Sequence, residues 1–304
     1  MRTADVDRAA ALLRAGALVA FPTETVYGLG ADARNGEAVA RIFEAKGRPH
    51  FNPLIVHVAN LDLARSLVIW SEQAEILART FWPGPFTMVL PLAGDHGLSE
   101  LVTAGLDTVA LRFPAHPVGA ALLDAFAGPV AAPSANPSGR ISPTTAEHVI
   151  SGLDDRISAV IDGGPSQVGL ESTIVAPGDP PRLLRQGSIS QEDLTSVLAS
   201  DIARPESGAI NAPGQLASHY APDAPVRLNV REAKAEEVLL GFGDVAGDVT
   251  LSASGDLVEA AANLFAALHR VNAMKRPIAV APIPDIGIGR AINDRLRRAA
   301  APRD

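Results

Sequence analysis

Gly16-Ala-Leu-Val-Ala-Phe-Pro-Thr-Glu-Thr-Val-Tyr-Gly-Leu-Gly-Ala-Asp-Ala33 is the stretch of sequence that decides the fold. Residues 17–21 are a short apolar run that predicts a buried strand, and Pro22 ends it because proline has no N–H for a sheet. Polar residues and glycines follow directly: Thr23, Glu24, Thr25, Tyr27, Gly28 and Gly30. Open α/β sheets build binding sites from polar side chains just past a buried strand, where glycine lets the backbone approach a ligand. We therefore expect a ligand site here.

The next segment predicts a helix that ends in two cations. Asn35 is a typical N-cap, apolar residues recur at helical spacing, and a Gly-x-Pro sequence ends the helix. Lys46 and Arg48 then lie where the chain turns, before a second strand-like run at 54–58. Such a pair suits an anionic ligand such as a phosphate. Cations at a helix end also complement the helix dipole without any ligand, and for these two residues alone that is the simpler interpretation.

Length and composition indicate two globular domains. A chain of 304 residues exceeds the size at which one core usually suffices. Apolar residues make up 47% and charged residues 20%, a mix able to bury a core, and the small apolar residues favour helices layered on a sheet. The chain has no cysteine, which excludes disulfides, thiolate metal sites and a cysteine nucleophile.

Charge and hydropathy restrict partners and location. A formal net charge of −8 argues against a general polyanion binder, although a local basic cleft remains compatible with it. Arginine and lysine residues could still hold ATP there: Lys46, Arg48, Arg112, Arg140 and Arg185. No apolar run reaches the roughly 18 residues of a membrane span, and the first residues lack the apolar region of a signal peptide. We therefore expect a soluble, cytoplasmic protein.

The order of elements predicts an α/β fold with a mixed sheet. Further strand-like runs lie at 87–92, 108–113, 129–132, 159–161, 173–175 and 182–184. Helix-like segments lie at 5–15, 61–68, 72–80, 117–126 and 192–198, and 93–106 is expected to be a loop. A helix after 142 has its N-cap at Ser142 or a capping box over 144–147. Because strict βαβ repeats are missing, the twisted sheet should be mixed rather than purely parallel.

The remainder predicts a linker and a second domain. Residues 1–200 form the first domain, residues 201–223 have little periodicity and read as a linker, and residues 224–304 form a small domain. The pattern of this small domain predicts a Rossmann-like α/β layer, with strand-like runs at 225–230, 238–242, 248–251 and 277–281 and a helix at 257–274. Gly241 to Gly247 is only a degenerate dinucleotide signature, and we interpret it as a turn.

Six motifs in order resemble those of the YrdC-type threonylcarbamoyl-AMP synthases. They are Pro22–Gly30, Lys46–Pro49, Asn52–Leu54, Trp82–Pro85, Ala132–Asn136 and Glu171–Ile174. Two later motifs, Ala212–Gly214 and His219–Pro222, resemble the linker of the long two-domain form. Ile288–Ala300 resembles the closing helix of its second domain, so the resemblance covers essentially the whole chain.

The resemblance implies a nucleotidyltransferase that condenses L-threonine, bicarbonate or carbon dioxide, and ATP. The products are threonylcarbamoyl-AMP and pyrophosphate, and a separate transferase machinery then uses the adenylate to modify adenosine in tRNA. Mg²⁺ is expected with ATP, held by its phosphates rather than by a cage of carboxylates. Direct tRNA binding, oligomeric state and the role of the second domain (lid, gate or docking surface) remain open.

The resemblance also assigns residues. It implies ATP binding by Lys46, Arg48, Ser134, Asn136, Ser142, Arg185 and Tyr220, with Lys46 and Arg48 catalytic. It implies threonine binding by Thr23, His57, Thr108, Arg112 and Ser172. The planar guanidinium of Arg112 suits the threonine carboxylate. Taken alone, His57 is more simply a histidine bonded within a strand, Ser134 and Asn136 are turn residues, and Tyr220 is equally a packed tyrosine.

The implied chemistry needs no covalent nucleophile and no protein-bound metal. A carbamate oxygen attacks the α-phosphorus, which requires in-line positioning and neutralisation of charge. The Gly-x-x-x-x-Gly-Lys-Ser/Thr loop of many ATP-binding proteins is missing, so the phosphates must be held differently, and we expect the head group of Lys46 in a solvated cleft. Leu184-Arg-Gln-Gly187 departs from the Leu-Arg-Pro-Gly of the family but keeps the arginine.

Two other functions are compatible with parts of the sequence. The chain could be an RNA-binding or regulatory module that keeps the concave binding surface of the family but catalyses no reaction. A related domain that adenylates carbamoyl phosphate occurs in larger maturation factors with zinc-finger segments, and the absence of cysteine argues against that reading.

Overall fold

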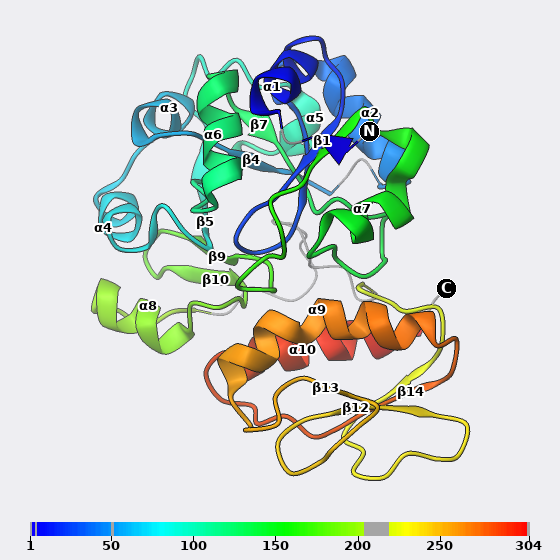
Figure 1. Cartoon of the computed structure of the whole chain (residues 1–304). Helices are drawn as coiled ribbons and strands as arrows, with labels where there is room; N and C mark the ends of the chain where they lie inside the picture. Colours follow the sequence, from blue (N-terminus) through cyan, green and yellow to red (C-terminus); the bar gives the residue numbers. More distant parts are fainter. Residues whose placement is uncertain (1, 4, 50–51, 204–218, 303–304) are drawn as a thin grey trace.

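A computed structural model describes residues 2–3, 5–49, 52–203 and 219–302. Within these ranges the chain forms one large and one small sheet with associated helices (Figure 1). The linker motif at 212–214 lies outside the described residues. The domain boundaries stay a prediction, although a helix ends at Leu198 and the first strand of the small sheet begins at Val226.

The large sheet contains ten strands among the described residues. In spatial order they are β1 (Arg2–Thr3), β8 (Ala159–Ile161), β2 (Val19–Phe21), β3 (Gly28–Asp32), β7 (Val130–Ala131), β4 (Ile55–His57), β6 (Thr108–Arg112), β5 (Phe86–Pro91), β9 (Thr173–Ala176) and β10 (Arg182–Arg185). Parallel pairs such as β4 with β6 alternate with antiparallel pairs such as β2 with β3 and β5 with β6. The predicted mixed sheet is confirmed.

Helices cover this sheet, and local sequence fixes their ends. They are α1 (Val6–Arg14), α2 (Gly36–Lys46), α3 (Leu61–Leu67), α4 (Glu72–Phe81), α5 (Glu100–Thr103), α6 (Pro117–Phe126), α7 (Ala146–Leu153), the 3₁₀ turn η1 (Asp154–Arg156) and α8 (Gln191–Leu198). The Asn35 side chain caps the first turn of α2, and Gly47 ends it at φ 60°. This end places Lys46 and Arg48 where the sequence predicted them.

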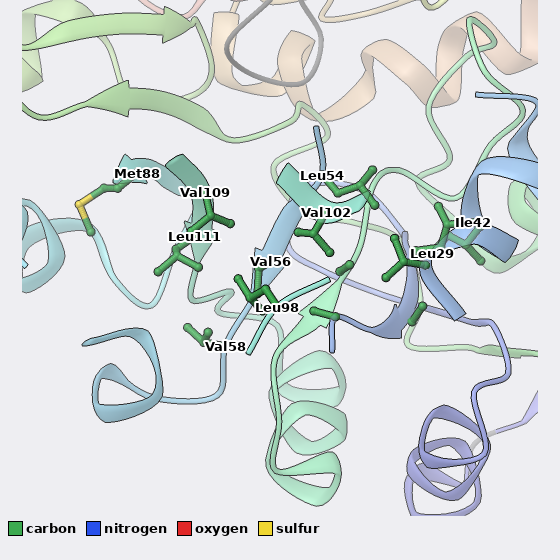
Figure 2. Close-up of a cluster of buried hydrophobic side chains, with 14 of the residues drawn as sticks. Leu29, Ile42, Leu54, Val56, Val58, Met88, Leu98, Val102, Val109 and Leu111 are labelled. Atoms are coloured by element: carbon green, nitrogen blue, oxygen red, sulfur yellow. The ribbon is translucent and has the colours of Figure 1, made fainter. Parts of the chain in front are cut away.

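The core of the large domain packs between sheet and helices. Figure 2 shows Leu29 and Ile42 on one side of a cluster whose middle is formed by Leu54, Val56 and Val102. All five side chains are fully buried. Because well-packed interiors resist displacement, this cluster fixes the ends of β3 and β4, from which the polar residues of the site extend.

The small sheet is parallel throughout. Its order is β11 (Val226–Arg227), β14 (Ile278–Val280), β12 (Val238–Gly241) and β13 (Val249–Thr250). Helices α9 (Leu257–Ala273) and α10 (Gly289–Ala300) pack together on the side of this sheet that faces the large domain (Figure 1). A parallel sheet with helices fits the predicted Rossmann-like layer. The segment from Gly241 to Gly247 is a turn, as predicted, closed by a bridge between Phe242 and Val245.

One strand was not predicted, and two local expectations were wrong. Gly28–Asp32 is a strand, in which the glycines let β3 pack closely on Phe21 and Val130. The expected loop at 93–106 contains helix α5, which Ser99 caps. The N-cap of α7 is Thr145, whose hydroxyl accepts from the backbone of His148, rather than Ser142 or Thr144.

The two domains share a hydrophobic cluster. Val26, Ile141 and Leu170 of the large domain belong to the same buried cluster as Phe265 of α9. Gly169 has φ 71°, and a Cβ atom added there would lie 2.3 Å from the carbonyl oxygen of Ala262. The large domain therefore packs directly on the backbone of α9.

We expect Gly169→Ala to lower the free energy of unfolding more than Gly105→Ala does. Gly105 has a similar φ of 79° but nothing within 4 Å, so alanine there adds only the left-handed backbone cost of about 1–2 kcal/mol. At Gly169 the methyl group must also displace α9, which should add about 2 kcal/mol or more. Urea unfolding of both variants measures the difference. Equal losses would show that the domains do not pack closely at this point.

Candidate functional site

A cavity lies at the edge of the large sheet that faces α9 and α10. Residues from both ends of the large domain and from the segment before the small domain line it: Thr23, Thr25, Val26, Gly28, Arg48, Ile55, His57, Arg112, Ala132, Pro133, Ser134, Glu171, Arg185, His219 and Tyr220. Seven of the twelve predicted ligand-binding residues are in this set: Thr23, Arg48, His57, Arg112, Ser134, Arg185 and Tyr220.

Strand ends place the first group of these residues. Strands β4 and β6 are parallel, and their last residues, His57 and Arg112, are Cα partners in the sheet. Strand β2 ends at Phe21, and Thr23 follows it two residues later. The carboxyl ends of parallel strands meet at one edge, which is why residues far apart in sequence gather there.

The Arg112 guanidinium is fixed by two side chains and by the carbonyl oxygen of Gly84, to which its Nε donates at 3.3 Å. Its Nη2 lies 2.7 Å from Oε1 of Glu24, and its Nη1 donates to the Thr25 hydroxyl at 2.7 Å. That hydroxyl in turn lies 2.8 Å from the hydroxyl of Thr23. All these side chains are buried, so the planar cation is held in one orientation at the cavity wall.

His57 lies beside Arg112 as a neutral acceptor. Burial, and then the charge of Arg112, hold the pKa of His57 well below its usual range. Its Nδ1 atom is buried and has no partner among the described residues. A neutral imidazole with a free ring nitrogen suits a donor on a ligand.

Lys46 and Arg48 are buried cations held by backbone oxygens. Lys46 Nζ donates to the carbonyl oxygens of Ser134 and Asn136, and Arg48 donates to those of Asn52 and Pro53. Across the parts of the chain that the structure describes, no carboxylate lies within ion-pair distance of either residue. The pKa of Lys46 is held well below its usual range, mainly by burial and secondly by the charge of Arg48. The pKa of Arg48 is lowered to about 10, mainly by burial and secondly by the charge of Arg185. Two buried cations without a counter-charge favour an anionic ligand.

The expectation that Lys46 sits in a solvated cleft was wrong. Its side chain is only 3% exposed and is not part of the cavity wall, because the backbone of Ser134 lies between them. The turn after β7 wraps around the ammonium group, and Asn136 completes it by donating to the carbonyl oxygens of Pro137 and Arg140.

Ser172 and Ser142 support the wall from behind. Arg185 donates from Nε to the carbonyl oxygen of Ser172 and from Nη2 to its hydroxyl, both at 3.0 Å. The Ser172 hydroxyl also lies 2.7 Å from that of Thr87. Ser142 donates to Oε1 of Glu171 at 2.6 Å. These two serines therefore hold residues that face the cavity and do not line it themselves.

Thr108 and Arg140 lie away from the cavity. Thr108 begins β6 and pairs with Pro91, four residues and about 13 Å from Arg112 at the other end of the strand. Arg140 forms an exposed ion pair with Asp223. The implied role of Thr108 in threonine binding stays a prediction that this geometry does not support.

No binding role was predicted for four buried residues that the structure places at the cavity or directly behind it: Glu24, Thr25, Glu171 and His219. Glu24 and Thr25 belong to the polar run of the expected ligand site, and the other two belong to sequence motifs. A signal was available for the two carboxylates, because each lies next to a hydroxyl residue, and a carboxylate that is buried there needs a basic partner. That partner is far away in sequence, so the pairing could not be predicted.

Metal ligands do not gather at the site. Over the described ranges, no group of three or more His, Cys, Asp or Glu residues is placed to hold a metal ion. The nearby carboxylates, Glu24 and Glu171, are engaged by Arg112 and Arg295. In the same ranges, no helix is long and apolar enough to cross a lipid bilayer.

Comparison with known proteins identifies relatives along the whole chain. The Sua5/YciO/YrdC family model, described as telomere recombination, matches residues 11–187. A second model, the threonylcarbamoyl-AMP synthase C-terminal domain, matches residues 189–301. The threonylcarbamoyl-AMP synthase of Bacillus subtilis (strain 168) is 42% identical over 327 residues, which cover 98% of this chain and 93% of the relative.

A relative of known structure shows the same two-domain arrangement. The threonylcarbamoyl-AMP synthase of Pyrococcus abyssi is 41% identical over 96% of this chain and 93% of its own length. The crystal structure of P. abyssi Sua5 complexed with L-threonine superposes with a TM-score of 0.89 at 38% identity, covering 99% of this chain and 96% of that one.

We expect His219 to make the fold less stable at low pH. Burial lowers the pKa of His219 to about 3, against 6.5 for an ordinary histidine. The unfolded chain therefore binds a proton that the folded chain excludes, and stability falls as the pH drops from about 6.5 towards 3. At pH 5 this histidine alone should cost about 2 kcal/mol relative to pH 7.5.

Urea unfolding of the wild type and His219→Gln at pH 7.5 and 5.0 checks this expectation. The variant should lose about 2 kcal/mol less than the wild type between the two pH values. The pair at pH 7.5 serves as the control for any effect of the substitution on packing. Identical losses in both proteins would show that His219 is protonated in the folded state.

Proposed function

The chain belongs to the Sua5/YciO/YrdC family of threonylcarbamoyl-AMP synthases in its two-domain form, and we propose that it condenses L-threonine, bicarbonate and ATP into threonylcarbamoyl-AMP and pyrophosphate. In this proposal the enzyme is a nucleotidyltransferase. Its product then supplies the machinery that places threonylcarbamoyl on adenosine in tRNA. The observation that carries the proposal is one cavity whose wall joins an oriented arginine, Arg112, to two further buried arginines, Arg48 and Arg185.

The end of the cavity near β4 and β6 suits the amino acid. The Arg112 guanidinium can offer the threonine carboxylate those N–H groups that its bonds to Glu24, Thr25 and Gly84 leave over, and these bonds fix its plane. The free Nδ1 of neutral His57 accepts from the threonine ammonium or hydroxyl. The P. abyssi relative, whose structure was determined with L-threonine, supports threonine as a substrate here.

A second group of lining residues suits the nucleotide phosphates. Arg48, Arg185 and Ser134 all line the cavity. Lys46 lies behind Ser134 and adds positive charge to the turn that would hold the phosphates. Magnesium would enter with ATP as part of the substrate, because the nearby carboxylates already have arginine partners.

The reaction then depends on position and charge. Bicarbonate gives carbon dioxide and hydroxide, and the hydroxide takes one proton from the threonine ammonium and leaves as water. The amine nitrogen then bonds to the carbon of carbon dioxide and releases a second proton to solvent, which gives a carbamate. A carbamate oxygen bonds to the α-phosphorus as the bond to the bridging oxygen of pyrophosphate breaks. Arg48 and Arg185 neutralise the charge that develops on the phosphates, and Arg112 keeps the threonine in line.

Purified protein should release pyrophosphate from ATP only when both threonine and bicarbonate are present. With ¹³C-bicarbonate, mass spectrometry should show a threonylcarbamoyl-AMP ion one mass unit heavier than with unlabelled bicarbonate. Omission of each substrate in turn is the control. Pyrophosphate release that needs neither threonine nor bicarbonate, or adenylation of carbamoyl phosphate instead, would refute the proposal.

Arg112→Met should raise the KM for threonine by roughly 10- to 100-fold, the range expected for losing about 1.5–3 kcal/mol of charged hydrogen bonding. The KM for ATP should change less than threefold, because other residues face the phosphates. Steady-state kinetics with each substrate varied measure both values. A larger effect on ATP than on threonine would reverse the assignment of the two ends of the cavity.

A further inference from the structure

A second cavity, of about 300 Å³, lies in the small domain at the carboxyl ends of the neighbouring parallel strands β11 and β14. Its lining includes Leu228 and Asn229, which follow β11, and Ala281, which follows β14. Helix α10 contributes Leu296 and Arg297. No described residue lines both this cavity and the first one. Small-molecule sites have volumes of roughly 300–1,000 Å³, so the second cavity can hold a small ligand.

The topology of the small sheet favours a ligand at this point. The chain passes from β11 across β14 to β12, and later from β13 across β12 back to β14, so the two crossovers run in opposite directions along the sheet. Right-handed crossovers that run in opposite directions lie on opposite faces of a sheet. In open parallel sheets such a reversal leaves a crevice at the carboxyl ends of the strands, and ligands bind there.

The buried part of the second cavity is apolar. Four of its lining side chains belong to the buried core of the small domain: Val280, Ala281, Ile283 and Leu296. Leu228 is partly buried and packs against the same core. An apolar group of a ligand would be stabilised here, because its surface would be removed from water.

The exposed part of the second cavity carries two opposite charges that do not pair with each other. In the parts of the chain that the structure describes, Arg297 has no hydrogen bond or ion pair. Over the same ranges, Asp285 has a single bond, which it accepts at 3.0 Å from Nδ2 of Asn293. Nδ2 of Asn293 also donates to the carbonyl oxygen of Ile283, so its Oδ1 atom is left as an acceptor.

We propose that the second cavity binds a free α-amino acid with an apolar side chain. Arg297 binds the carboxylate, Asp285 and Oδ1 of Asn293 accept from the ammonium group, and the apolar part of the cavity takes the side chain. Asn293 and Arg297 lie one turn apart on α10, about 6 Å along its axis, a span that a zwitterion can bridge with a hydrogen bond at each end. The site is independent of the proposed function.

A nucleotide or free phosphate suits the second cavity less well. Among the described residues that line it, Arg297 is the one cation, and the carboxylate of Asp285 would repel a phosphate group. The described lining also contains no aromatic residue, so a base would have no ring to stack on. A carboxylic acid without an amine would pair with Arg297 but leave Asp285 without a counter-charge.

Ligand-detected NMR titration of the full-length protein with L-leucine, L-isoleucine, L-valine and L-methionine tests the proposal. We expect a Kd of about 1 mM or tighter for at least one of these probes. Two analogues of that probe should each bind at least tenfold more weakly: its amide, which has no carboxylate for Arg297, and the carboxylic acid without the amine, which has no ammonium for Asp285. Binding of none of the four amino acids, or equal affinity for the amide, would overturn the proposal.

Variants show which cavity the probe occupies. Arg297→Met should raise the Kd of the best probe at least tenfold and remove its preference over the amide, and Asp285→Asn should raise the Kd at least threefold. Arg290→Met removes a cation of the same helix that lies outside the second cavity, and Arg112→Met removes a cation of the first cavity. Each of these two controls should change the Kd less than twofold.

Thermal unfolding checks that all four variants fold, and the Arg297 side chain is exposed, so its loss leaves the packed core intact. Wild-type affinity in Arg297→Met would overturn the proposal. A loss in Arg112→Met as large as that in Arg297→Met would also overturn it, because the probe would then occupy the first cavity. Binding is measured without ATP, so a wild type that binds the probe but releases no pyrophosphate would refute only the proposed function.

Discussion

Burial of cations against neutral oxygens is the constraint on which the rest of this structure depends. Lys46 and Arg48 lose most of their hydration and receive backbone carbonyl oxygens in return. Hydrogen bonds to carbonyl oxygens satisfy the donors but do not compensate the positive charge. Burying such a charge costs free energy, and the pKa values of both groups are lowered for this reason. Only a tightly packed scaffold can hold such an arrangement, and a polyphosphate would relieve it.

The scaffold meets this requirement by joining distant parts of the chain at one sheet edge. Strands β4 and β6 place His57 and Arg112 side by side, and the turn after β7 encloses Lys46. The two helices of the second domain face the large domain and share a buried cluster with it (Figure 1). Each of the two carboxylates at the site is paired with an arginine. Glu24 orients Arg112, and Arg295 of α10 neutralises Glu171. The wall therefore stays positive where phosphates would bind and polar where an amino acid would bind.

The sequence predicted those features that depend on neighbours along the chain. The α2 cap at Asn35, the end of that helix at Gly47 and the mixed character of the sheet could be predicted, because local turns and periodicity indicate them. The β3 strand was missed because its glycines serve packing rather than flexibility. Likewise, the burial of Lys46 and its distance from solvent depend on a turn 88 residues away, which no local pattern reveals. Thr108 illustrates the converse, since a role implied by a family resemblance gives no information on which end of a strand meets the cavity.

In the proposed function, nucleotide phosphates and threonine occupy a single cavity. A crystal structure with L-threonine and α,β-methylene-ATP, which cannot release pyrophosphate, tests this arrangement most directly. We expect the threonine carboxylate on Arg112, the phosphates between Arg48 and Arg185, and the threonine nitrogen facing the α-phosphorus. Threonine and nucleotide bound at separate places, or phosphates held away from both arginines, would contradict it.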